Sequence, residues 1–115
     1  MATITPTSMT SIAPVTVTEA TLTGTDDFTY NASKTQLLIL RNGTGGALTP
    51  NITGDEATTQ YVAGIGNVDV SGGYDFASIA DGDTVVLDLA DIKGYLAGTI
   101  SMTGGTGIVA SLLEV

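Results

Sequence analysis

Apolar and polar residues alternate along most of the chain in short runs, and a period of two residues is the pattern of strands with one buried face. The first clear run spans 15–22, where Val15 and Val17 share one face. Further runs, separated by turn residues, lie at 28–31, 36–40, 48–53, 74–79, 84–89, 99–102 and 108–115, with shorter segments at 61–62 and 68–70 that we expect to pair locally. We therefore predict an all-β fold, a small antiparallel β-sandwich or barrel of about seven to nine short strands.

One run is apolar at four consecutive positions, 37–40, instead of at every second position. A strand that is apolar on both faces is expected to be central and buried on both. We predict that Leu38, Ile39 and Leu40 lie in the core. Pro50 has no backbone N–H to donate, so the run that contains it is predicted to be an edge strand or a bulge.

Turn residues suggest how the strands connect. Asp81 and Gly82 lie between two alternating runs, and an Asp-Gly pair in that position predicts a β-hairpin. The glycine-rich turn at 104–107 is expected to join the last two runs into a closing hairpin. Between these hairpins, either Asp88 or Asp91 is suited to cap a single helical turn, and we expect at most one such turn.

The first 14 residues are rich in threonine and show no hydrophobic period. Pro6 and Pro14 favour extended conformations in the residues that precede them. A frayed terminus is one interpretation of such a segment. The other, which we adopt, is an extended N-terminal arm, residues 1–14, that binds a partner and precedes a single β domain, residues 15–115. The candidate partner-binding residues of the arm are Ile4, Pro6, Met9, Ile12 and Pro14.

Composition removes several classes of function. The chain has no histidine and no cysteine, so it has no imidazole base, thiol nucleophile, disulfide or common zinc site. Twelve acidic and three basic residues give a formal net charge of −9, which opposes binding to nucleic acid or to an anionic membrane. The N-terminal segment lacks the basic and apolar regions of a secretory signal, and no apolar run approaches the length of about 20 residues that a spanning helix needs.

Carboxylates are the remaining catalytic candidates, because two of them can flank a glycosidic bond as acid and base. The available pairs lie in predicted turns, where aspartate bonds the nearby backbone, so a structural role is favoured. These pairs are Asp26 with Asp27, Asp55 with Glu56, and Asp81 with Asp83. The segment 64–70 faintly resembles one unit of a calcium-binding β-roll, a fold that needs tandem copies. We predict no enzymatic activity, no cofactor and no metal.

The pattern resembles the small β-rich head proteins encoded beside the major capsid protein in tailed bacteriophages. The resemblance spans about residues 15–115, and the segments that carry it are Asp27–Tyr30, Gln36–Gly43, Tyr95–Gly98 and Ile108–Val115. It implies a capsid decoration protein, made in the host cytoplasm and located on the capsid exterior, whose partner is the major capsid protein. It also implies a homo-oligomer, commonly a trimer, that bridges adjacent capsomers. The chain has no distinctive trimer motif.

Two other functions remain open. A phage tail-fibre or adhesion module that binds host-surface glycans requires a clustered aromatic face, and a carboxylate-based glycan hydrolase requires a cleft with two carboxylates. Neither feature is evident in the sequence, which has no tryptophan, four tyrosines and two phenylalanines.

Overall fold

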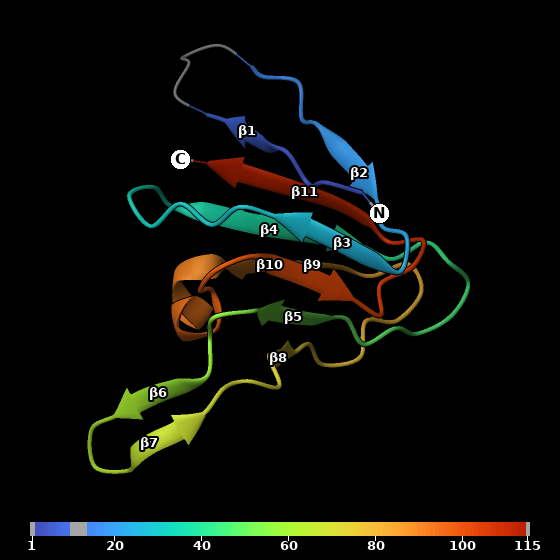
Figure 1. Cartoon of the computed structure of the whole chain (residues 1–115). Coiled ribbons are helices and arrows are strands. Elements are labelled where there is room, and N and C mark those ends of the chain that lie inside the picture. Colours follow the sequence, from blue (N-terminus) through green and yellow to red (C-terminus); the bar gives the residue numbers. More distant parts are fainter. Residues whose placement is uncertain (1, 10–13, 115) are drawn as a thin grey trace.

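The computed structural model describes residues 2–9 and 14–114 and confirms a mostly β fold of sandwich type, with two sheets packed face to face (Figure 1). Eleven strands are assigned within these residues, more than the seven to nine predicted, because several contain only two to four residues. The five-stranded sheet consists of β1 (Pro6–Ser8), β2 (Glu19–Thr21), β4 (Gln36–Arg41), β9 (Thr84–Asp88) and β11 (Val109–Glu114). The four-stranded sheet consists of β3 (Thr25–Phe28), β5 (Asn51–Gly54), β8 (Tyr74–Asp75) and β10 (Ile100–Thr103). A separate two-stranded hairpin consists of β6 (Thr59–Val62) and β7 (Gly66–Asp69).

The five-stranded sheet is organised around β4, which lies between β11 and β9 and pairs antiparallel with both. Leu38 and Leu40 point into the core and are fully buried, as predicted. Ile39 was also predicted to be a core residue, and this is corrected: it points to the outer face and is half-buried. The strand is central within its sheet, but only one face of that sheet is covered by the other sheet.

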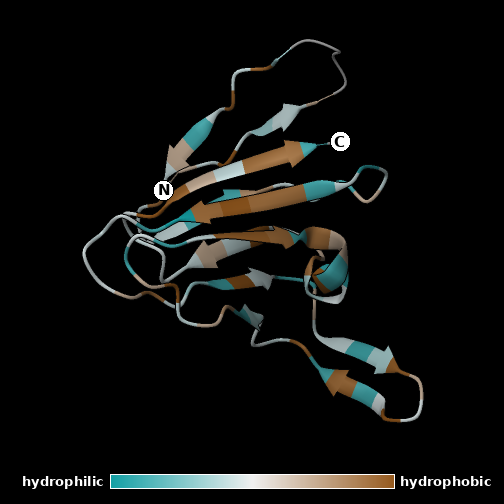
Figure 2. Cartoon of the chain, turned by 180° about the vertical axis from the view of Figure 1, so that it is seen from behind, coloured by the Kyte–Doolittle hydropathy of each residue, from teal (hydrophilic) through white to brown (hydrophobic). Residues whose placement is uncertain are grey.

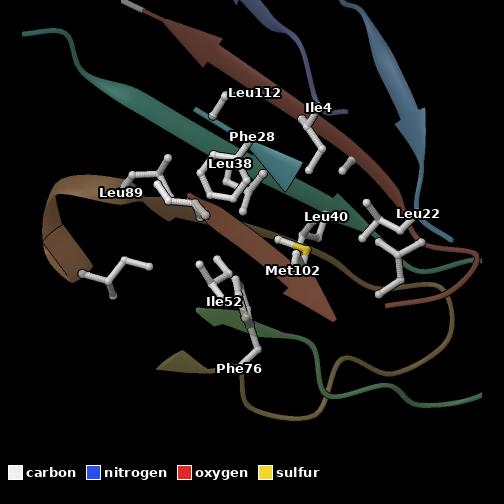
Figure 3. Packing of buried hydrophobic residues seen from close by; sticks show 14 of the residues in the cluster. Ile4, Leu22, Phe28, Leu38, Leu40, Ile52, Phe76, Leu89, Met102 and Leu112 are labelled. Carbon is white, nitrogen blue, oxygen red and sulfur yellow. The ribbon is translucent and has the colours of Figure 1, made fainter. Parts of the chain in front are cut away.

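The four-stranded sheet places β10 between β3 and β5. Alternation along β10 directs Ile100 and Met102 inward, where Met102 is opposite Ile52 of β5 in the register. Figure 3 shows Met102 and Ile52 facing Leu38 and Leu40 across the core. Pro50 precedes β5, which is paired on both sides, so the predicted edge position of this run is wrong.

The described part of the predicted arm belongs to the β domain. Residues Pro6–Ser8 form β1, which pairs parallel with β11, and Thr3 forms a bridge with Asp27. Ile4 is 1% exposed and lies in the core cluster. Assignment of Ile4 as an accessible partner anchor is therefore corrected, and the division between 1–14 and 15–115 does not mark a domain boundary in the described residues.

Neither of the two predicted hairpins forms, because the strands on either side of each turn lie in different sheets. β8 pairs with β5 in one sheet and β9 with β4 in the other, so the Asp81-Gly82 turn precedes a strand of the opposite sheet. In the same way β10 and β11, on either side of the 104–107 turn, lie in different sheets. These connections cross the sandwich, and the turn residues alone do not distinguish a crossing from a hairpin.

The one helical element in residues 2–9 and 14–114 is η1 (Leu89–Tyr95), a 3-10 helix that closes one end of the sandwich with Leu89 and Ile92. The prediction of one short helical segment with an aspartate cap is confirmed: the side chain of Asp88 accepts a hydrogen bond from the backbone N–H of Ala90 at 3.0 Å. The element has seven residues, with a kink at Ile92, and so is longer than the single turn that was predicted. None of the helical structure in the described ranges has the length and apolar character needed to cross a membrane.

Candidate interaction surfaces

The β6–β7 hairpin projects from the body of the sandwich (Figure 1). Its two strands pair antiparallel, with Tyr61 opposite Asn67. Gly64 and Gly66 adopt φ angles of +84° and +99°, which glycine adopts without the steric cost that a Cβ would add. The sequence predicted that 61–62 and 68–70 pair locally, and β6 and β7 pair with each other.

Large apolar side chains are exposed on this hairpin. Ile65 is 75% exposed, Tyr61 69% and Val62 37%. No residue from 57 to 68 is charged, although the whole chain carries a formal net charge of −9. We call Tyr61, Val62 and Ile65 the hairpin tip; it is an uncharged, apolar projection on an acidic protein.

The outer face of the five-stranded sheet is a second apolar surface. In the register of its three longest strands, Ile39 lies between Val86 of β9 and Ser111 of β11. Val86 is 60% exposed, and its apolar neighbours on this face are half-buried; they are Leu37, Ile39, Val109 and Leu113. Figure 2 shows the apolar character of β4 and β11, together with the apolar positions on both strands of the projecting hairpin.

One ion pair lies on the same outer face. Arg41 of β4 and Glu19 of β2 are 3.4 Å apart, and about half of each side chain is exposed. This pair places one of only three basic residues beside the apolar surface. Exposed pairs of this kind stabilise a fold weakly.

The outer face of the four-stranded sheet is polar. The positions that alternate with its core residues hold threonine, serine, asparagine and aspartate: Thr25 and Asp27 on β3, Ser101 and Thr103 on β10, Asn51 and Thr53 on β5. The side chain of Asn51 donates to the carboxylate of Asp75 at 2.8 Å. Asn51 and Asp75 on this face are therefore hydrogen-bonded to each other.

Asp26 and Asp27 do not act as a pair, because adjacent strand residues point to opposite faces. Asp26 is 1% exposed and accepts hydrogen bonds at 3.0 Å from the backbone N–H groups of Thr23 and Ala2. Burial raises the pKa of Asp26, but these bonds and one from the Thr23 hydroxyl outweigh burial, so its pKa is lowered overall. Asp26 therefore ties the chain before β3 to the N-terminal segment.

One carboxylate of each of the other candidate pairs is also bound to backbone. Asp55 accepts from the N–H of Thr99 at 2.8 Å, and Asp81 accepts from the N–H of Gly45 at 2.9 Å. In the segment 64–70, which was compared with a calcium-binding unit, Asp69 accepts a hydrogen bond from Ser71, and the Ser71 hydrogen bonds lower the pKa of Asp69. Among the residues that the structure describes, no three acidic side chains form a cluster suited to a metal ion.

A shallow pocket lies where the N-terminal segment meets β3 and the start of β10. Its lining residues are Thr3, Asp27, Phe28, Thr29, Gly98, Thr99 and Ile100. Asp27 is the one carboxylate in this lining, and its buried Oδ1 atom has no hydrogen-bond partner. Glycoside hydrolysis of the usual kind needs a second carboxylate, which the lining does not supply.

The described arm residues differ in their burial. Ile4 is in the core, Pro6 is exposed in β1, and Met9 is 44% exposed. Pro14 is exposed, and Ile12 lies outside the described residues. The sequence pattern did not lead us to predict a site at the hairpin tip. The available signal was Ile65, an apolar residue between the two glycines of a turn. Comparison of the chain with protein-family models, curated proteins and solved structures gives no match.

Proposed function

We propose that this chain is a structural virion protein that binds the outer surface of a bacteriophage capsid and stabilises the contacts between capsomers. Its partner would be the major capsid protein, and its assembly a homo-oligomer such as a trimer. The observation that carries the proposal is the projecting hairpin with its uncharged apolar tip. A particle-binding protein needs such an anchor on a rigid scaffold and needs no reactive group.

The hairpin suits attachment because its conformation is already formed. Burying a large apolar side chain contributes roughly 1.5–3 kcal/mol, and the gain is larger when little backbone entropy is lost on binding. Tyr61 is paired in β6, and the turn that carries Ile65 is closed by a 3.0 Å bond from its N–H to the carbonyl of Val62. The tip also has no charge to desolvate, so its burial against a protein surface avoids that cost.

One observation favours the second candidate, an adhesion module that binds host-surface glycans. Tyr74, Phe76 and Tyr95 form a group of rings, with Tyr74 centred 5.2 Å from Phe76 and 5.9 Å from Tyr95. All three rings pack against or within the core and contact one another edge to face, so each ring has less free surface on which a sugar could stack. The hairpin tip therefore supports the capsid proposal more strongly than these rings support glycan binding.

The proposal is tested on gradient-purified phage particles from cells that produce the protein, by immunogold labelling and by measuring the ratio of the protein to the major capsid protein. We expect label on the head exterior in a fixed ratio. Label on the tail fibres would favour the adhesion module, and absence from the particle would overturn the proposal.

A variant pair tests the anchor. Particles stripped of the protein are incubated with the Tyr61→Ser, Ile65→Ser double variant, and we expect at least about a tenfold loss of affinity, since 1.4 kcal/mol corresponds to tenfold. The matched control is Val17→Ser, which removes an apolar side chain of 41% exposure away from the hairpin. Equal binding by both variants would exclude the hairpin as the anchor.

A further inference from the structure

The edges of the two sheets differ in how they are protected from pairing with another chain. Exposed edge strands are usually short, interrupted by proline or charge, or covered. At one edge, β1 has three residues and contains Pro6, and β2 has three residues and contains Glu19. β8 has two residues. These three strands offer little backbone for pairing.

The edge at β3 is covered by the N-terminal segment. The N–H of Ile4 donates to the carbonyl of Asp27 at 2.8 Å, and the N–H of Asp27 donates to the carbonyl of Ala2 at 3.0 Å. β9 is different, because it has five residues, contains no proline, carries its one charge, Asp88, at its last position, and pairs with β4 alone among the described strands. It is the least protected edge of the two packed sheets.

The backbone groups that face outward from β9 follow from its register. The N–H of Asn42 donates to the carbonyl of Asp83 at 2.9 Å, which marks a hydrogen-bonded pair next to the strand. Because such pairs alternate in an antiparallel ladder, Val85 bonds to β4 while Thr84 and Val86 direct their N–H and C=O groups away from it. Within the described residues, no backbone bond outside the ladder involves Thr84 or Val86.

The side chains and charges around this edge define what it would bind. Val86 is 60% exposed and Thr84 is exposed, so a strand added here meets β-branched side chains. Acidic residues lie at both ends: Asp81 and Asp83 before the strand, Asp88 and Asp91 at and after its end. We infer that β9 pairs with an extended segment of a different polypeptide, with β-branched residues at its centre and lysine or arginine at both ends.

Charge also decides against a second copy as the occupant. Antiparallel pairing of β9 with itself would set Asp81 and Asp83 of one copy beside Asp88 and Asp91 of the other, a local repulsion at this edge that leaves self-association through other surfaces open. A basic segment instead places its cations beside the acidic ends, which favours association and gives it a dependence on salt. This site is separate from the hairpin tip, and its test needs no phage particle, so the two proposals fail or succeed independently.

The probe is a synthetic peptide, Lys-Thr-Val-Thr-Val-Thr-Lys, added to the full chain. Amide hydrogen exchange is followed by NMR at Thr84 and Val86, whose N–H groups point away from β4. We expect exchange at both amides to slow by about tenfold or more when the peptide is bound, because a new ladder protects them. A peptide with glutamate in place of both lysines should bind about tenfold more weakly at low salt.

Val86→Pro is the decisive variant. Proline at this position removes an N–H that points away from β4, so the fold should persist while peptide binding is lost. Val86→Thr is the matched control, since it keeps the N–H and the β-branched shape. If Val86→Pro does not fold, the wild-type protein is tested with a peptide in which alternate amides are N-methylated. This peptide is unable to form the ladder, so it should give no protection.

Three results would overturn the inference. They are unchanged peptide binding by Val86→Pro or by the N-methylated peptide, equal binding of the lysine and glutamate peptides, and protection of Val86 that rises with protein concentration in the absence of peptide. The last result would identify a second copy as the occupant.

Discussion

The outer faces of the two sheets have opposite character, although their inner faces contribute to the same core. On the four-stranded sheet, the outward positions hold residues such as Thr53 and Ser101, and the inward positions hold Ile52 and Met102. This is the ordinary alternation of a sheet with one solvated face. On the five-stranded sheet, the outward positions of β4 and β9 include Ile39 and Val86.

This difference separates two uses of apolar residues. The inward residues of both sheets stabilise the fold, because they are removed from water when the sheets pack. The outward residues of the five-stranded sheet are only partly removed from water, so they add less to the stability of the isolated chain. An apolar surface that persists on an acidic, sparsely charged protein is typical of a contact with another molecule. The contrast between the faces can be tested by mutation.

The largest expected effect distinguishes the two faces of β4. Leu38→Ala should lower the free energy of unfolding by about 2–5 kcal/mol, because Leu38 is fully buried and its truncation leaves a cavity. Ile39→Ala should cost about 1 kcal/mol, since the side chain is half-buried. Urea denaturation of both variants measures the difference. Equal losses would mean that the outer face is as well covered as the core.

A smaller effect, dependent on pH, belongs to the four-stranded sheet. Asp26→Asn should cost about 1–3 kcal/mol at pH 7, because an amide replaces a carboxylate that accepts from Thr23 and Ala2. The pKa of Asp26 is lowered in the folded state, so its stabilisation is present above its unfolded value of 3.8 and is lost as the pH falls through the folded pKa. The wild-type protein and the variant should therefore begin to converge in stability as the pH falls below 3.8, and converge fully only below the folded pKa.

The matched control for this prediction is Asp83→Asn, which changes an exposed carboxylate on the other side of the sandwich. Its stability relative to the wild-type protein should change little between pH 7 and pH 3. Convergence of both variants with the wild-type protein to the same extent would indicate a general charge effect and not the local hydrogen bonds of Asp26.

The sequence was sufficient to predict the parts of the fold that depend on local pattern. Alternation and turn residues identified most strands, and the run at 37–40 identified the central strand with Leu38 and Leu40. Sheet membership was predicted less well, because a glycine-rich turn permits either a hairpin or a crossing and the choice depends on long-range pairing. Ile4 was misplaced for the same reason: its short segment is ordered by strands distant in the sequence.

The candidate surfaces were harder to predict than the core. Tyr61 and Ile65 are apolar, and only the projection of the hairpin away from both sheets shows that they are exposed. Asn42 shows the converse, since this polar residue directly after β4 is fully buried. Its side-chain amide donates at 2.8 Å to the carbonyls of Gly46 and Ile79. Solvent exposure is a property of the assembled sheets, and a local sequence pattern does not specify it.

The smallest expected effect concerns the ion pair beside the apolar face. Removing either charge, by Glu19→Gln or Arg41→Gln, should change the free energy of unfolding by no more than about 0.5–1 kcal/mol, because both side chains are about half exposed and solvent screens their attraction. A double-mutant cycle with both substitutions gives the coupling directly, and the coupling should shrink further in about 1 M salt, where the screening length falls to about 3 Å. A coupling well above 1 kcal/mol that is insensitive to salt would mean that the surface around Arg41 and Glu19 is shielded from water. The outer face of the five-stranded sheet would then resemble an interior surface more than its exposure indicates, and its contrast with the outer face of the other sheet would be one of burial as well as of polarity.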